Sequence, residues 1–183
     1  ARRAIDASRV SVAGILECAP REVIFTGSGT ESNNLFIFGA AEAYANRGRH
    51  IITTKIEHDS VLRPLEQLEK KGFEVTYLDV GPDGIVDPEN VRKALRPDTI
   101  FVTVMYANNE IGTIQPIAEI AAVIRKFRDE HAIAPTPLSL LHTDACQAAP
   151  YLDTSVKNLG VDAMTINGGK IYGPKGVGAL FLK

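Results

Sequence analysis

Short apolar runs rich in β-branched residues alternate with amphipathic stretches along the whole chain. Strand-length runs that are apolar on both faces are typical of a parallel sheet that helices cover on both sides. Seven such runs are predicted to be strands, over residues 23–25, 50–56, 74–80, 99–106, 138–143, 163–166 and 177–182. The alternation therefore predicts an α/β fold with a mostly parallel sheet and helices on both faces.

Three stretches between these runs, residues 31–46, 60–71 and 117–128, show the three- and four-residue apolar spacing of amphipathic helices, with Gly72 as a C-terminal cap. Residues 88–95, which open with a proline, predict a further short helix. Residues 82–84 have the composition of a turn, and residues 132–137, which include two prolines, that of a loop. Because no repeat or linker interrupts the pattern, residues 1–183 are expected to form one layered domain.

The composition excludes several classes of function. The 20 Lys and Arg residues nearly balance the 22 Asp and Glu residues, so neither a nucleic acid nor an anionic membrane is an expected partner. The longest apolar stretches have only strand length, and no apolar run follows the first residues. Neither a transmembrane helix nor a signal peptide is therefore expected. Two cysteines, Cys18 and Cys146, make neither a disulfide framework nor a zinc cluster, which indicates a cytoplasmic protein without a metal site.

The residues after the first predicted strand suggest a phosphate site, because ligands of open parallel sheets bind beyond the carboxyl ends of the strands. In residues 27–33 (GSGTESN), two glycines allow a close backbone approach, and the N–H groups of a helix start favour a phosphate. An ordinary helix cap, with Thr30 before Glu31, explains the same residues and stays an alternative. The segment lacks the third glycine of a dinucleotide-binding loop and the Gly-Lys-Ser/Thr of a P-loop.

Polar residues also follow four other predicted strands, and each has a structural alternative. His58 is a candidate catalyst or a helix cap, and Asn109, in an Asn-Asn pair, is a candidate ligand or a turn residue. Asp144 ends a buried strand, where a carboxylate needs a partner or serves as a helix cap. Lys170, preceded by two glycines, is a candidate nucleophile or a surface residue, whereas Lys175, between Pro174 and Gly176, fits a surface loop better.

One cofactor accounts for the whole set. A phosphate cradle, an imidazole, an amide, a buried carboxylate and a lysine are the parts that a pyridoxal phosphate site requires. In such a site the lysine holds the cofactor, the carboxylate keeps the ring nitrogen protonated, and the glycine loop holds the phosphate. The order of the strand-end residues therefore predicts pyridoxal 5'-phosphate as the cofactor.

At these residues the chain resembles the cysteine desulfurases of the NifS/IscS type, within the class V aminotransferase fold. The resemblance rests on TGSGTESNN (26–34), KIEHDSVL (55–62), ANNEIGTIQPI (107–117), TDACQ (143–147) and GGKIYGPKGVGAL (168–180). The forms NNEIG and KIYGPKG favour this branch over the SufS-like branch and over other class V enzymes. The resemblance implies that residues 1–183 are a large domain of the pyridoxal phosphate-dependent, aspartate-aminotransferase-like fold.

The resemblance also implies a role for each candidate residue. Lys170 would hold the cofactor covalently, and His58 would stack on its ring and take part in proton transfer. Asp144 would pair with the pyridine nitrogen, and Gln147 with the phenolic oxygen. The remaining implied cofactor contacts would come from Gly29 and Thr30 at the phosphate and Asn109 at the ring substituents.

The chain departs from the family pattern in two ways. The family usually has a serine three residues before the lysine and a histidine immediately before it, where this chain has Asn167 and Gly169. Asn167 can still donate to a phosphate, but Gly169 has no side chain to offer. The family's sulfur-accepting cysteine lies well beyond the lysine, and the N-terminal segment and C-terminal small domain are absent as well. We therefore expect a fragment that is inactive by itself, with neither Cys18 nor Cys146 as the nucleophile.

The activity implied by the resemblance is the conversion of L-cysteine to L-alanine. The sulfur would be left as a persulfide for iron–sulfur cluster or thio-cofactor assembly. The implied partners are L-cysteine, a sulfur-acceptor or iron–sulfur scaffold protein, and a second copy of the chain in a homodimer. Two alternatives stay open: another class V enzyme, such as an aminotransferase or a lyase, and a non-catalytic domain with the same fold. The presence of Lys170, Asp144 and His58 together argues against the second alternative.

Overall fold

The computed structural model describes residues 2–131 and 139–183, and its strands form a single sheet. The seven strands of this sheet are β1 (Val23–Thr26), β2 (His50–Thr54), β3 (Glu74–Leu78), β4 (Thr99–Thr103), β5 (Leu140–Asp144), β6 (Ala163–Asn167) and β7 (Gly178–Leu182). The strand order is β1-β7-β6-β5-β4-β2-β3. All neighbours from β3 to β6 are parallel, and β7 runs antiparallel between β6 and β1. The prediction of a mostly parallel sheet is confirmed.

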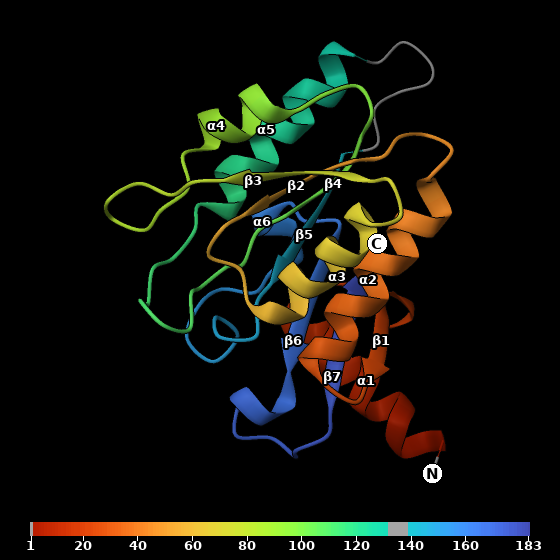
Figure 1. The fold of residues 1–183 in the computed structure, drawn as a ribbon. Helices are drawn as coiled ribbons and strands as arrows, with labels where there is room; N and C mark the ends of the chain where they lie inside the picture. The colour runs from red at the N-terminus through yellow and green to blue at the C-terminus, as the bar shows by residue number, and fades with distance from the viewer. Residues whose placement is uncertain (1, 132–138) are drawn as a thin grey trace.

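Helices cover both faces of the sheet, as the apolar runs predict (Figure 1). The face under α2 (Gly29–Tyr44) and α3 (Asp59–Glu69) is filled by one cluster of buried apolar side chains. A second cluster fills the opposite face, under α1 (Arg2–Leu16), α4 (Pro88–Ala94), α5 (Ile117–Glu130) and α6 (Val156–Leu159). Two short 3-10 turns, η1 (Pro20–Glu22) and η2 (Gly168–Lys170), complete the described elements.

A helix forms at each of the four predicted positions, although its ends are shifted. Two further helices, α1 and α6, were not predicted. Most of α1 is exposed, including its large apolar side chains Ile5, Val10 and Ile15, and only Ala13 and Leu16 are buried. The other, α6, is a single turn of four residues, too short to show a period. The strands β2, β3 and β4 end earlier than predicted because the apolar residues that follow them lie in the connecting turns. The loop predicted over residues 132–137 and the first residue of the predicted strand 138–143 lie outside the described residues.

The topology directs the carboxyl ends of β1, β6, β5, β4 and β2 to one edge of the sheet. Thr26 pairs with Gly178, and Gly178 pairs with Asn167, so these residues form a row across β1, β7 and β6. All the strand-end segments selected from the sequence therefore lie along this edge. Within the described residues, no helix is long and apolar enough to cross a membrane.

Candidate functional site

The first turn of α2 presents backbone N–H groups at the edge of the sheet. Ser28 caps this helix, since its Oγ accepts a hydrogen bond from Glu31 N at 3.1 Å. The cap is therefore Ser28, two residues before the Thr30 that the sequence suggested as the capping residue. Because the first N–H groups of a helix have no acceptor within it, those of Gly29 and Thr30 are available to a ligand. Gly29 is buried and Thr30 is exposed.

Close packing brings the start of α2 against the turns that follow β5 and β6. A Cβ atom placed on Gly29 would lie 2.5 Å from Cys146 Sγ and 3.3 Å from Asn167 Cβ. A Cβ atom on Gly178 would lie 2.5 Å from the carbonyl carbon of Ser28. The distances of 2.5 Å at Gly29 and at Gly178 are both shorter than van der Waals contact. Glycine at these two positions therefore lets the start of α2 pack against the turns after β5 and β6 and against β7. The segment predicted to bind phosphate thus lies directly beside the segment that leads to Lys170.

Lys170 ends η2, immediately beyond β6. Asn167 caps this turn, since its Oδ1 accepts a hydrogen bond from Gly169 N at 3.1 Å. The Lys170 side chain is exposed, so its amine is accessible. A Cβ atom on Gly169 would meet only Asn167 Oδ1, at 3.6 Å, which is an ordinary contact. The position just before the lysine therefore has room for a side chain.

Asp144 provides a buried carboxylate at the end of β5, with 7% of its surface exposed. Its Oδ2 accepts a hydrogen bond from Asn33 Nδ2 at 2.7 Å, and its Oδ1 accepts one from Cys146 N at 2.9 Å. The strand-end carboxylate therefore has the partners that the sequence argument required. The second of these bonds is a local cap of the turn after β5, so the capping alternative also holds.

His58 caps α3 and is joined to Asp144 by a chain of hydrogen bonds. Its Nδ1 accepts from Ser60 N at 3.0 Å and lies 2.9 Å from Ser60 Oγ. Asn33 Nδ2 donates to Ser60 Oγ at 2.8 Å as well as to Asp144. Since Nδ1 accepts a backbone N–H, the neutral His58 ring carries its proton on Nε2. The helix-cap alternative is confirmed, and it leaves Nε2 as the nitrogen that can donate to a ligand.

Asn109 lies with His58 on the wall of a hollow of about 440 Å³ beyond β2 and β4. The preceding Asn108 is a turn residue, because its Oδ1 accepts from Glu110 N and Ile111 N at 2.8 and 3.0 Å. Asn109 itself is exposed. The turn interpretation of the Asn-Asn pair thus holds for Asn108, and Asn109 stays available to a ligand.

Glu57, which was not among the residues selected from the sequence, is a buried acid that lines the same hollow. Its Oε1 accepts from Thr54 Oγ1 at 2.6 Å and from Met105 N at 2.8 Å. Burial raises the pKa of Glu57 to about 8, although these two hydrogen bonds oppose the shift, and the neighbouring Asp144 adds to it. At neutral pH, Glu57 is therefore protonated and uncharged.

Cys146 lies in the site but is poorly suited to act as a nucleophile. Burial raises the pKa of the Cys146 thiol, and the charge and hydrogen bonding of Asp144 raise it further, against the smaller opposing effect of Lys170. A thiol with a raised pKa is mostly protonated and therefore unreactive.

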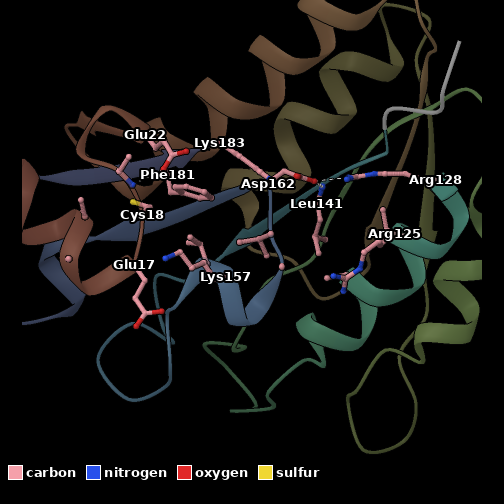
Figure 2. Close-up of a pocket in the computed structure, with 18 residues that line it drawn as sticks. Glu17, Cys18, Glu22, Arg125, Arg128, Leu141, Lys157, Asp162, Phe181 and Lys183 are labelled. Carbon is pink, nitrogen blue, oxygen red and sulfur yellow. Dashed lines mark hydrogen bonds and ion pairs between the residues drawn. The ribbon is translucent and has the colours of Figure 1, made fainter. Parts of the chain in front are cut away.

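Cys18 lies in a different place, in a cavity of about 830 Å³ bounded by α1, α5 and α6 (Figure 2). The labelled side chains are of mixed charge, and Arg128 donates to Asp162 at 2.6 Å. Burial and the charge of Glu22 raise the pKa of the Cys18 thiol. The residues that line this cavity include none of the predicted cofactor ligands. Neither cysteine is thus an activated thiol.

The predicted residues lie along one edge of the sheet, but only some of their side chains are held by hydrogen bonds or close packing. Hydrogen bonds and close packing hold Gly29, His58, Asp144 and Asn167 in place. Gln147 lies half-buried in the turn after β5. Asn33, Ser60 and Glu57 were not among the predicted site residues, although all three are buried in the site. Their signal was weak, because each is an ordinary polar residue within segment 26–34 or 55–62, and only tertiary packing buries it.

The chain is similar in sequence to one family of known proteins. The sequence model of the family described as aminotransferase class-V matches residues 1–183. The chain is 46% identical over 182 residues to "Cysteine desulfurase IscS" of Dictyoglomus turgidum, covering 100% of this chain and 44% of that protein. "Cysteine desulfurase IscS" of Psychromonas ingrahamii is 44% identical over 182 residues, covering 100% of this chain and 43% of that protein.

Solved structures show the same likeness. A "NIFS-LIKE PROTEIN" superposes with a TM-score of 0.90 at 37% identity, covering 98% of this chain and 47% of its own. The structure titled "SspA in complex with cysteine" superposes with a TM-score of 0.88 at 39% identity, covering 98% of this chain and 49% of its own. This chain therefore spans less than half the length of the relatives that it matches.

Proposed function

Because the chain belongs to the aminotransferase class-V family, we propose that it is the cofactor-binding large domain of a pyridoxal phosphate-dependent cysteine desulfurase. The observation that carries the proposal is the network at the edge of the sheet. There, a buried carboxylate, Asp144, is joined through Asn33 and Ser60 to His58. The names of the similar proteins, cysteine desulfurases among them, support the same reaction class.

The donor set of the site fits pyridoxal phosphate. The N–H groups of Gly29 and Thr30 suit a phosphate, and the buried Asp144 carboxylate suits a protonated ring nitrogen. Lys170 would supply the amine that holds the cofactor, and Asn109, Gln147 and Asn167 would supply further polar contacts. Asn33 Oδ1 is buried without a hydrogen-bond partner among the described residues, so the site retains unused polar capacity.

The side chains of the site would divide the chemistry among them. When bound, pyridoxal phosphate withdraws electrons from the α-carbon of an amino acid. Asp144, held by Asn33, would pair with the protonated ring nitrogen. His58, whose neutral ring carries its proton on Nε2, would donate and accept a proton at that nitrogen. Lys170 would act as a second proton carrier when its amine is free.

We further propose L-cysteine as the substrate, L-alanine as the product, and a persulfide as the form in which the sulfur leaves. The persulfide would pass to a sulfur-acceptor or iron–sulfur scaffold protein. The raised pKa values of Cys18 and Cys146 support a sulfur-accepting cysteine outside residues 1–183. Exposed Tyr151 and Tyr172 line one hollow with Ile15 and Ile171, and such a contiguous apolar patch supports a homodimer. The unpaired cysteines are consistent with a cytoplasmic protein.

The first experiment is to purify the protein with pyridoxal phosphate and record its visible absorbance. We expect a yellow wild-type protein, and we expect the Lys170→Ala variant to lose the colour of the covalently held cofactor. Lys175→Ala is the matched control, since Lys175 is an exposed lysine in the same loop region, and it should stay yellow. A colourless wild type would contradict the proposal.

A second measurement separates desulfuration from other class V chemistry. Sulfide release from L-cysteine, without amino transfer to a keto acid, identifies a desulfurase. Residues 1–183 alone should give little or no turnover, because neither cysteine has an activated thiol. Robust desulfuration by these residues alone would instead point to Cys146 as the sulfur acceptor.

A further inference from the structure

Glu57 lies in the floor of the site and has no place in the chemistry described above. It is 6% exposed and accepts two hydrogen bonds on one oxygen, Oε1, from Thr54 Oγ1 and Met105 N. Its other oxygen, Oε2, is buried without a partner among the described residues. Burying a carboxyl oxygen without a hydrogen-bond partner costs folding free energy, so the burial of Glu57 calls for an explanation.

The two donors to Glu57 come from different strands. Thr54 is the last residue of β2, and Met105 lies two residues beyond the end of β4. The segments that leave these strands carry His58 and Asn109, which line the same hollow as Glu57. One carboxyl group thus ties together the two segments that present the candidate ring-contacting residues. Asn108 adds a second tie, since its Nδ2 donates to Ile56 O at 3.0 Å.

The charge of Glu57 matters because Asp144 is its neighbour. Burial raises the pKa of Glu57 to about 8, and the charge of Asp144 is a smaller cause that acts in the same direction. Asn33 donates a hydrogen bond to Asp144, whereas Glu57 Oε2 has no donor among the described residues. The other charged or titratable residues that line the hollow are all exposed: Lys55, His58, Asp59 and Glu110.

We propose that Glu57 is a positioning residue of the cofactor site. Its uncharged carboxyl group fixes the segments that carry His58 and Asn109 by accepting hydrogen bonds from Thr54 and Met105. The inference rests on the proposed function, because it assigns Glu57 a role toward the bound cofactor.

The affinity of the purified protein for pyridoxal phosphate, measured by absorbance titration at pH 7, tests the positioning role. Glu57→Gln keeps a neutral group of the same shape and should bind within about twofold of wild type. Glu57→Ala leaves Met105 N buried without an acceptor and should bind about tenfold more weakly. Glu110→Gln is the matched control, since Glu110 is an exposed acid of the same hollow, and its affinity should not change.

The pH dependence of unfolding, measured without cofactor, tests the charge state. Since the pKa of Glu57 is raised in the folded state, ionising it costs stability, which falls as pH rises toward about 8. Between pH 6.5 and 8 we expect the melting temperature of wild type and Glu110→Gln to fall by about 5 °C. Glu57→Gln has no such group and should show a flat profile there. This measurement does not depend on the fold surviving Glu57→Ala.

The outcomes separate the two proposals. A wild type that binds no pyridoxal phosphate overturns both the proposed function and the role of Glu57 in it. If the wild type binds, a Glu57→Ala variant that binds equally well overturns only the positioning role. A Glu57→Gln variant as weak as Glu57→Ala, or one that keeps the wild-type fall in melting temperature, overturns the neutral state of Glu57.

Discussion

At the scale of single residues, the site depends on how closely three backbone segments can approach. Gly29 has no side chain, and the thiol of Cys146 occupies the space where its Cβ would lie. Cys146 therefore acts as a packing residue, in agreement with its protonated state. The two residues share one small volume, so a change at either should be felt at the other.

We expect Gly29→Ala to destabilise the protein by about 1–3 kcal/mol, because the new methyl group would overlap Cys146 Sγ. The variant Cys146→Ala removes the obstructing sulfur and should lower the cost of Gly29→Ala in the double variant, which keeps only the tight contact with Asn167 Cβ at 3.3 Å. Denaturant unfolding of the four proteins in this cycle measures the coupling.

Gly169→Ala is the control for the loss of a glycine in the same site. Its Cβ would make only an ordinary contact, so its free energy of unfolding should change by no more than about 0.5 kcal/mol. Additive effects of Gly29→Ala and Cys146→Ala would show that the two side chains do not compete for space.

At the scale of elements, hydrogen bonds of buried side chains join α2, α3 and the end of β5. Asn33, from α2, donates to Ser60 in α3 and to Asp144 in β5. These are contacts between residues 27 and 111 positions apart, and all three side chains are buried. The position of the carboxylate relative to the imidazole therefore depends on how helices and sheet pack together.

We predict that Asn33→Ala lowers the free energy of unfolding by about 1–3 kcal/mol, since Asp144 and Ser60 each lose a donor in a buried site. The loss should also weaken pyridoxal phosphate binding, because Asp144 is no longer held. Urea unfolding and cofactor titration measure the two effects.

The adjacent Asn34 offers the control on the same helix. Its Nδ2 donates to Thr30 O within α2 and, at 3.4 Å, to Ser60 O. Asn34→Ala should cost no more than about 0.5 kcal/mol and leave cofactor binding unchanged. If Asn33→Ala and Asn34→Ala lowered the free energy of unfolding equally, the hydrogen bonds from Asn33 to Asp144 and Ser60 would not be the cause of the loss.

At the scale of the whole molecule, buried titratable groups give stability a dependence on pH. His142 lies in the middle of β5, where Thr103 Oγ1 and Thr165 Oγ1 bind its two ring nitrogens at 2.8 and 3.1 Å. It stacks on Phe36 of α2 with ring centroids 4.5 Å apart. Burial lowers the pKa of His142 to about 4, so the folded protein keeps its ring neutral.

His142 should therefore make stability fall as pH drops from 6.5 toward 4, because the unfolded chain binds a proton at His142 that the folded chain does not. Its contribution is about 1.4 kcal/mol per pH unit within that window. The raised pKa of Glu57 acts in the opposite direction over the same range, so the His142 contribution is the difference in pH slope between wild type and His142→Gln. Urea unfolding of both proteins at pH 7, 6 and 5 measures this difference. His50, whose pKa burial also lowers, keeps its own contribution in both proteins.

His131→Gln is the control, because this exposed histidine at the end of α5 lies outside the buried core. It should keep the full slope. If His142→Gln retained the wild-type slope, His142 would not be the group that titrates.

The sequence by itself determined the architecture and indicated the candidate site segments. Apolar runs of strand length and helical spacing are local patterns, and the chemistry proposed for Asp144, His58 and Lys170 follows from residue type and from their places at strand ends. The helices α1 and α6 were not predicted, because α1 buries only Ala13 and Leu16 and α6 is a single turn.

Only the tertiary structure decided which polar groups are buried and with whom they pair. Asn33 and Ser60 resemble ordinary polar residues near a helix start, and Glu57 resembles any acid before a histidine. Their hydrogen bonds and the raised pKa of Glu57 arise when α2, α3, β4 and β5 close over them. Burial and hydrogen-bond pairing are properties of contacts between distant residues, which a local pattern does not contain.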